Sequence, residues 1–256
     1  MRTTFLLTPL LLVACSSPRI PASKIVETKI SIEQATLLHC KTHNGSITIV
    51  GSNASNTIDL RVEMKVRGYT QQEADDNLQL MSLLNQHDGQ ALRIWGEYPK
   101  PQLNNCSPSF TFTMEVPEHL ALRLETHNGD VTASGTKDVM HIESHNGDVE
   151  ASVGNTSADI ETHNGEIHVT MKAPGDLNAR IVSHNGDIDV RMHAGSSCWL
   201  EAETHNGSID PPSASFGSVV WAPLAVAPLT SCSVTQQKLL VARGVVLMWR
   251  RLRLVT

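Results

Sequence analysis

Six of the 12 histidines in this chain lie in one repeated tripeptide, His-Asn-Gly, which follows Thr or Ser in every copy. Histidine is the commonest metal ligand in proteins and changes charge near about pH 6.5, so a row of imidazoles could bind a transition metal or sense acid. The alternative is a structural corner that was duplicated together with its repeat. The motif residues are His43, Asn44, Gly45, His127, Asn128, Gly129, His145, Asn146, Gly147, His163, Asn164, Gly165, His184, Asn185, Gly186, His205, Asn206 and Gly207.

The spacing of the motif predicts a stacked-strand repeat. The asparagines of the last five copies are 18, 18, 21 and 21 residues apart, and a fixed period of about twenty residues is typical of solenoids. In every copy the residues five and three positions before His are apolar, and the residue four positions after it is β-branched. This alternation predicts strand, turn and strand, with one face buried.

Turn chemistry accounts for most of the motif. Asn and Gly tolerate positive φ and are therefore the strongest short turn signal. The preceding Thr or Ser can bond to turn backbone, and stacked Asn side chains can form an amide ladder. Histidine is the residue that a turn does not require.

A metal site needs three or four ligands that converge on one point, whereas a repeat spreads its ligands along a line. The sequence therefore leaves open a purely structural corner and a column that binds metal or protons. The acids beside the glycines add oxygen atoms, but they lack the nonapeptide signature of Ca²⁺ repeats. The histidines of the candidate metal column are His127, His145, His163, His184 and His205.

The N-terminus carries a targeting segment. Arg2 precedes a short apolar stretch at 5–13, which is too short for a permanent membrane span. The stretch ends in "LVAC", which resembles a bacterial lipobox and implies cleavage before Cys15 and lipid attachment to it. The alternative is an ordinary secretory signal with an incidental cysteine. Ser16 follows where inner-membrane lipoproteins carry Asp, so we expect outer-membrane sorting in a two-membrane bacterium.

Four further cysteines allow three disulfide pairings in an exported protein. We favour Cys40–Cys106, because both lie near predicted strands in the N-terminal half. The other two are Cys198 and Cys232.

The region between the first two copies differs from the repeats. Alternation predicts strands at 57–66, 90–98 and 109–116. A capping-box spacing between Thr70 and Glu73, followed by apolar residues at helical intervals, predicts one helix over 70–86.

The chain thus divides into five parts: a signal peptide at 1–14, a lipidated linker at 15–30, an N-terminal β region at 31–117, the repeat solenoid at 118–210 and a tail at 211–256. The tail carries five basic and no acidic residues. It is either a basic, apolar cap or membrane contact, or the product of a reading-frame shift near Gly217. We favour the second interpretation, which predicts that 218–256 lack defined structure.

The order of these parts resembles the bacterial "putative-adhesin" domain of unknown function, a β-strand-repeat family. The resemblance covers roughly residues 30–210 and rests on "HCKTHNGSITIVG", "VEMKVRGYTQQEAD", "LRIWGEYP" and "FTMEVPEHLALRLETHNGDV". It implies an all-β fold, a β-solenoid or β-roll of about 18–21-residue repeats with one short inserted helix, on cell-envelope proteins. It supplies no catalytic residues and no support for a metal.

We therefore expect a non-enzymatic, lipid-anchored envelope protein whose solenoid is a surface binding or scaffold module. Its lipid would attach it to the membrane. Its binding partner would be an envelope protein or a polysaccharide. No cofactor is predicted apart from the transition-metal alternative, and the net charge of -6 with 4% aromatics argues against nucleic acid. The alternatives are a metal-binding or pH-responsive envelope protein and, second, a β-helix enzyme acting on polysaccharide.

Overall fold

The computed structural model describes residues 19–53, 56–99, 106–154, 157–171, 176–191, 193, 197–210, 218–221, 232–242 and 245–254. The predicted signal peptide at 1–14 and the lipid attachment residue Cys15 lie outside these ranges.

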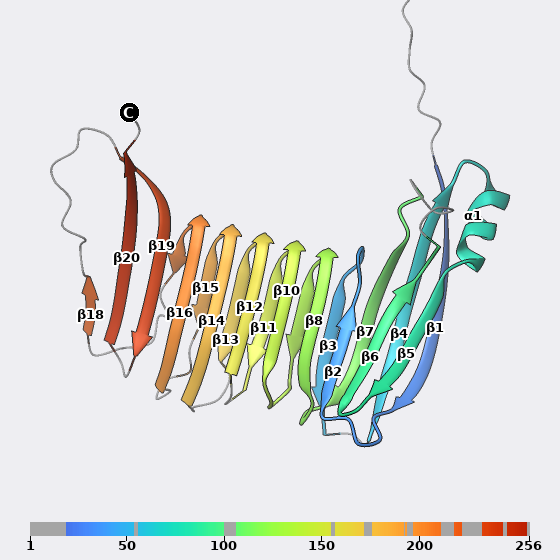
Figure 1. The fold of residues 1–256 in the computed structure, drawn as a ribbon, viewed down its shortest axis with the longest axis horizontal. Coiled ribbons are helices and arrows are strands. Elements are labelled where there is room, and N and C mark those ends of the chain that lie inside the picture. The colour runs from blue at the N-terminus through green and yellow to red at the C-terminus, as the bar shows by residue number, and fades with distance from the viewer. Residues whose placement is uncertain are drawn as a thin grey trace, which may run out of the picture.

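Each repeat is one coil that crosses from one sheet to the other (Figure 1). The strand before each His-Asn-Gly lies in the first sheet; these strands are β2 (Leu37–Lys41), β8 (Ala121–Asn128), β10 (Met140–Asn146), β12 (Ser157–Asn164), β14 (Asp176–Asn185) and β16 (Ser197–Asn206). The strand after it lies in the second sheet; these are β3 (Ile47–Ser52), β9 (Val131–Ser134), β11 (Val149–Val153), β13 (Ile167–Met171), β15 (Ile188–Arg191) and β17 (Ile209–Asp210).

Neighbouring coils pair in parallel and in the register predicted by aligning the copies on His. Met140 of β10 lies opposite Leu122 on one side and Ala158 on the other. These alternating apolar side chains point between the two sheets, where Leu122, Met140 and Ala158 are at most 3% exposed. The predicted all-β solenoid of strand–turn–strand repeats is confirmed, and both sheets are open.

The first copy of the motif stacks directly on the second, although 84 residues separate Asn44 from Asn128. β2 pairs with β8, and β3 pairs with β9, both in parallel. The intervening residues form extra strands that extend both sheets beyond the first coil. Both sheets therefore run without a break through the boundary expected near residue 117. The added strands are β1 (Ile20–Ser31), β4 (Thr57–Gly68) and β7 (Ser109–Pro117) in the second sheet, and β5 (Ser82–Asp88) and β6 (Ala91–Glu97) in the first.

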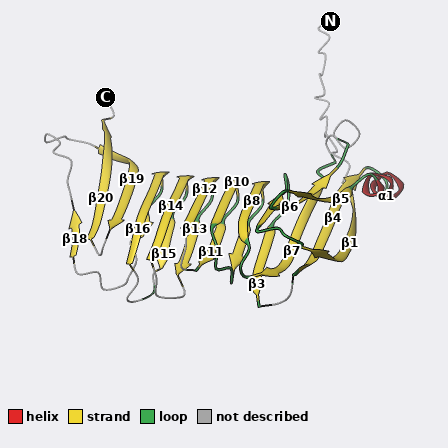
Figure 2. Cartoon of the chain, turned by 60° about the horizontal axis from the view of Figure 1, so that its bottom comes forward, coloured by secondary structure: helices red, strands yellow, loops and turns green. Residues whose placement is uncertain are grey.

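The inserted helix is shorter than predicted. α1 spans Gln71–Gln79 and lies at the end of the stack that the extra strands form (Figure 2). The predicted cap is confirmed, because the Glu73 N–H donates to Thr70 Oγ1 at 3.1 Å and the Tyr69 N–H donates to Glu73 Oε2 at 2.8 Å. The second half of the expected 70–86 helix is instead strand β5, which forms a hairpin with β6. Among the described residues, no helix is long and apolar enough to cross a membrane.

The tail also differs from the expectation that 218–256 lack defined structure. Its described residues form strands β18 (Ser218–Trp221), β19 (Cys232–Ala242) and β20 (Val245–Leu254). β19 pairs with β16 in the antiparallel direction, so the tail does not continue the repeat. A free strand edge offers a row of unpaired N–H and C=O groups, and a strand of almost any sequence can add to it.

Candidate functional site

The six Asn side chains form the predicted amide ladder along one edge of the stack. From Asn128 to Asn206, each Asn Nδ2 donates to Oδ1 of the Asn in the preceding coil, at distances of 2.8, 2.8, 2.8, 2.7 and 2.6 Å. The ladder ends at Asn44, whose Nδ2 donates to the Pro108 carbonyl at 3.0 Å. The asparagines therefore link successive coils through side chains as well as through backbone.

The Thr and Ser hydroxyls also link coils. The predicted local bond is present in the first copy, where Thr42 Oγ1 donates to the Asn44 carbonyl at 3.1 Å. In the second copy, Thr126 Oγ1 instead donates to the Gly45 carbonyl of the neighbouring coil at 3.2 Å. The same bond recurs from Thr162 to Gly147 at 3.2 Å and from Thr204 to Gly186 at 2.9 Å. These hydroxyl-bearing side chains are at most 7% exposed, so the bonds lie beneath the corner.

The Asn-Gly pair is a corner between two sheets rather than a hairpin turn. Among the described non-glycine residues, only Glu33 and Ser107 have positive φ, so the motif asparagines do not use the tolerance on which the turn prediction rested. Gly129 has a φ of +153°, and a Cβ built on it would lie 2.3 Å from the Gly45 carbonyl oxygen. Glycine is therefore required because the backbones of adjacent coils approach closely at this point.

The six histidines form one continuous column of rings on the exposed edge, in which His145–His163 and His163–His184 are tilted by 38° and 30° and the other neighbouring pairs are stacked. Successive ring centroids are 4.7, 4.5, 4.7, 4.6 and 4.5 Å apart from His43 to His205. Partial desolvation lowers the pKa of His145, and repulsion from His127 and His163 lowers it further. Protonation of one ring thus makes protonation of its neighbours less favourable.

The column does not converge on a metal. The lone pair of an imidazole nitrogen lies in the ring plane, so stacked rings present lone pairs that run side by side. The His43 and His127 rings, for example, are only 5° from parallel. Within the described part of the chain, no group of three or more His, Cys, Asp and Glu side chains could hold a metal ion.

The acids beside the glycines form a second ladder. Asp130 Oδ1 accepts a hydrogen bond from the Asp148 N–H at 3.0 Å, and Asp148 Oδ1 accepts one from the Glu166 N–H at 2.8 Å. Hydrogen bonds from the backbone and side chain of Ser208 lower the pKa of Asp187. These carboxylates hold the backbone of the next coil, a role that the sequence pattern did not reveal.

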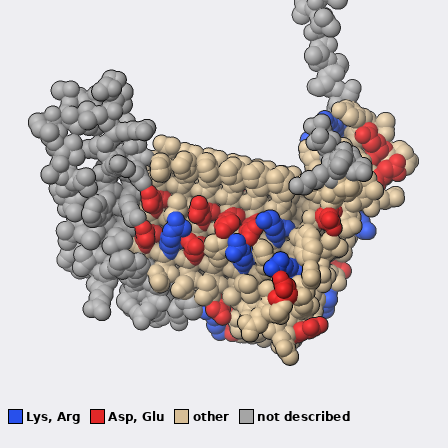
Figure 3. Space-filling model, in the orientation of Figure 1, with Lys and Arg blue, Asp and Glu red and all other residues tan. Residues whose placement is uncertain are grey.

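Charged side chains form mixed rows across one face of the stacked strands (Figure 3). Glu125 is their best-connected member: it accepts hydrogen bonds from Lys41 Nζ at 2.6 Å and Arg123 Nε at 2.7 Å, and lies 3.0 Å from His39 Nε2. Burial alone would raise the pKa of Glu125, but the bonds from Lys41 and Arg123 prevail and lower it to about 2. Sequence reasoning missed this group, although all its members occupy outward positions of the repeat.

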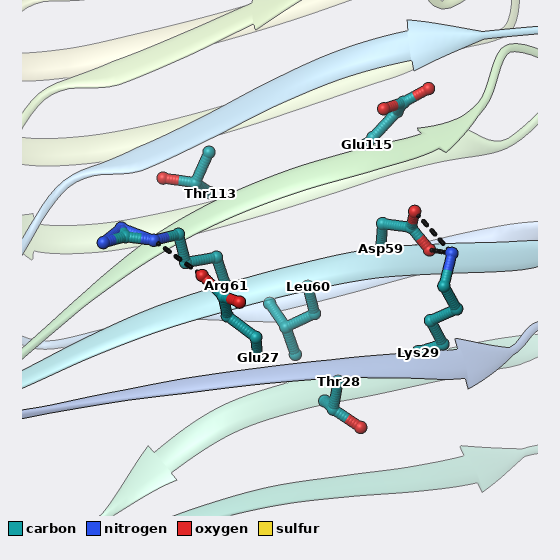
Figure 4. A pocket seen from close by; sticks show the side chains of 8 residues that line it. All are labelled: Glu27, Thr28, Lys29, Asp59, Leu60, Arg61, Thr113 and Glu115. Carbon is teal, nitrogen blue, oxygen red and sulfur yellow. Dashed lines mark hydrogen bonds and ion pairs between the residues drawn. The ribbon is translucent and has the colours of Figure 1, made fainter.

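Two clefts lie on or beside the extra strands. A cleft of about 600 Å³ over β1, β4 and β7 is lined by ion pairs, Lys29 with Asp59 at 2.8 Å and Arg61 with Glu27 at 3.2 Å (Figure 4). Its cations are thus neutralised by carboxylates of the same cleft. A second cleft, of about 450 Å³, lies where β6 meets the first two coils; it is lined by Lys41, Thr42, His43, Trp95, Gly96, Tyr98, Glu125, Thr126 and His127.

Residues 24–218 match the family described as Toastrack DUF4097. The chain belongs to this family. Among curated proteins, none matches the sequence.

Solved structures similar to this Toastrack protein include two whose descriptions mention adhesion. A "putative cell adhesion protein" from Clostridium sporogenes is 10% identical, with a TM-score of 0.37 over 74% of this chain and 98% of that one. A "putative adhesin" from Bacteroides fragilis is 13% identical, with a TM-score of 0.37 over 73% of this chain and 96% of that one. A "putative lipid binding protein" from Parabacteroides distasonis is 12% identical, with a TM-score of 0.27 over 76% and 95%.

The disulfide predicted for this Toastrack domain is not formed. Cys40 is a free, fully buried thiol on β2, and burial raises its pKa. Cys106 lies beside the helix, where its Sγ accepts a hydrogen bond from Asn77 Nδ2 at 3.5 Å. One thiol thus faces the core between the sheets of the first coil and the other packs under α1. Sequence proximity to strands could not reveal this difference.

Proposed function

We propose that this Toastrack protein is a lipid-anchored envelope protein without catalytic activity, whose rigid solenoid is an adhesin-like binding and scaffold module. The observation that carries the proposal is the continuous outer face of the stack, which two side-chain ladders tie from coil to coil. A rigid, extended surface loses little conformational entropy on binding and suits a long partner such as a polymer.

The state of the acids also supports a binding role over catalysis. A general acid must be protonated near neutral pH, whereas the pKa of Glu125 is lowered to about 2 and the pKa of Asp187 is also lowered. Asp130 and Asp148 accept backbone hydrogen bonds from the next coil. These repeated carboxylates are therefore suited to hold structure rather than to transfer protons.

The lipid anchor rests on the sequence "LVAC" at 12–15. The experiment is metabolic labelling with radioactive palmitate in a bacterium, followed by separation of membrane and soluble fractions. We expect label and membrane association in the natural chain, loss of both in Cys15→Ser, and retention of both in the matched control Ser17→Ala. An unlabelled natural chain, or a Cys15→Ser protein that keeps its label, would refute the anchor.

The stacked imidazoles favour a second candidate function, a pH-responsive envelope module. Rings 4.5 to 4.7 Å apart repel one another when they carry protons, so acid adds mutually repelling charge to the column. A response to pH suits this geometry better than metal binding does, because the ring nitrogens do not converge on one point. Its test is the pH dependence of stability treated in the Discussion.

A further inference from the structure

The cleft beside the first coil collects aromatic side chains in a protein that has few of them. The chain contains 4 Trp and 2 Tyr, and this one cleft is lined by Trp95 and Tyr98 together with the first two histidines of the column. Its volume of about 450 Å³ lies within the range of small-molecule sites. The site exists because the β5–β6 hairpin meets the solenoid here, at the end of the histidine column.

Strand register places the floor of the cleft. Lys41 lies opposite Trp95 on one neighbouring strand and opposite Glu125 on the other. Because these three strands are adjacent, the three side chains form one row across the outer face of the sheet. Trp95 is only half-buried, although Ile94 beside it is fully buried, which shows that the indole points outward.

The aromatic wall is held from beneath. The Tyr98 ring stacks on Phe110, with centroids 6.5 Å apart, and Phe110 in turn stacks on Phe112 at 6.4 Å. Gly96 makes room for this arrangement, because a Cβ built on it would lie 2.3 Å from the Phe110 ring. Tyr98 is thus supported by the core, and a supported ring loses little entropy on binding a ligand.

The charges of the cleft are balanced. Lys41 and Glu125 lie 2.6 Å apart within it, and Arg123 contacts the same carboxylate at 2.7 Å. A phosphate or sulfate would have to displace Glu125 from its cations, and a cationic ligand would have to displace Lys41. A neutral ligand can use the amine as donor and the carboxylate as acceptor without breaking the pair.

We propose that this cleft binds a neutral hexopyranose or N-acetylhexosamine unit of a polysaccharide. Such a sugar has an apolar C–H face that stacks on Trp95 and Tyr98, and hydroxyl groups that both donate and accept hydrogen bonds. Lys41 donates to them, Glu125 accepts from them, and the imidazoles of His43 and His127 form the remaining wall. The site rests on the proposed binding function and names its ligand class.

The test is isothermal titration of the full chain, kept in a detergent without sugar groups. The probes are chitotetraose, cellotetraose and maltotetraose, with tetragalacturonic acid as an anionic comparison. We expect at least one neutral probe to bind, with a dissociation constant between micromolar and millimolar, and the anionic probe to bind at least tenfold more weakly. No binding of any neutral probe, or tighter binding of the anionic one, overturns the proposal.

Variants locate the site. We expect Trp95→Ala and Tyr98→Ala each to weaken binding at least tenfold and Trp95→Phe to weaken it less, because phenylalanine keeps an aromatic face. The matched control is Tyr69→Ala, which removes an exposed tyrosine from under the Arg19 guanidinium, outside the cleft. Unchanged binding in Trp95→Ala, or equal loss in Tyr69→Ala, overturns the assignment.

A further variant tests the site with a substitution that should not disturb folding. Lys41 has a side chain 64% exposed, so Lys41→Met should fold, and we expect it to weaken sugar binding at least threefold. Binding as tight as in the natural chain would refute the role of the amine. These measurements use purified protein and do not depend on the palmitate experiment. A chain that is lipidated but binds no sugar refutes the site alone, and a chain that binds sugar but takes up no palmitate refutes the anchor alone.

Discussion

Asn146 donates a hydrogen bond from Nδ2 to Oδ1 of Asn128, 18 residues earlier, at 2.8 Å. The same Asn146 accepts a bond of equal length from Asn164 on its other side. Because its amide is both donor and acceptor, one residue type can repeat without limit along the stack. The ladder therefore couples each coil to both neighbours and resists the opening of a single coil.

Asn146→Ala should lower the free energy of unfolding by about 1–2 kcal/mol, because it removes two hydrogen bonds from a partly exposed ladder. The measurement is urea unfolding of the full chain followed by circular dichroism. The matched control is Asn85→Ala, on the exposed face of β5 and away from the ladder, which should change the free energy by less than about 0.5 kcal/mol. Equal effects of the two substitutions would show that the ladder contributes no stability.

Gly129→Ala should destabilise the chain by more than about 3 kcal/mol, because its Cβ would lie 2.3 Å from the Gly45 carbonyl oxygen, where backbone cannot move away. Gly89→Ala is the matched control. Gly89 has a φ of +60° and no atom within 4 Å of its Cβ position, so only the backbone strain of about 1–2 kcal/mol remains. Urea unfolding of the two variants separates the cost of the close approach between coils from the cost of backbone strain. Equal losses would mean that backbone strain alone, and not the close approach of the coils, explains the glycine at the corner.

The coil itself could be predicted from sequence because its signal is local and repeated. Alternate apolar positions on each side of Asn-Gly can be buried only if successive copies stack in one register, and the pairing of Leu38 with Leu122 obeys this. The asparagine ladder could be predicted from the same stacking. The expectation of a corner once per coil came from the same repeat, but the positive φ expected of its asparagines is not used, because this corner joins two sheets instead of two strands that pair with one another. Here β8 and β9 lie in different sheets.

The end of the helix could not be predicted because two patterns overlap. Leu78, Met81 and Leu84 have helical spacing, but Leu84 lies opposite Trp95 in a hairpin that Gly89 closes with its positive φ. The hairpin is held in the first sheet because β6 also pairs with the distant strand β2, and this tertiary pairing outweighs the helical propensity of the segment.

The cleft lined by Trp95 and Tyr98 was equally hidden, because Lys41 and Glu125 are 84 residues apart and only parallel pairing brings them together. No local pattern marks such a pair.

Acid should weaken the solenoid through the histidine column. The pKa of His145 is lowered in the folded chain, by partial desolvation and by His127 and His163, so the unfolded chain binds more protons as the pH falls. The contribution to stability is fully present above the unfolded pKa of about 6.5 and is lost as pH falls through the lower folded value. Glu125 does not contribute in this range. Its pKa is lowered from 4.5 to about 2 in the folded chain, so the stability that it contributes is lost only as the pH falls below about 4.5.

The measurement is the urea midpoint of the full chain at pH 7.5 and at pH 5.0. We expect the natural chain to have a lower midpoint at pH 5.0 than at pH 7.5. In His145→Gln the difference between the midpoints at the two pH values should be smaller, because Gln keeps a polar side chain at the corner but cannot be protonated. His119→Gln, an exposed histidine outside the column, is the matched control and should leave the difference unchanged. His39, whose pKa is also lowered by burial, remains in both variants and accounts for a residual dependence. If His145→Gln and His119→Gln respond alike, the stacked rings have no role in sensing acid.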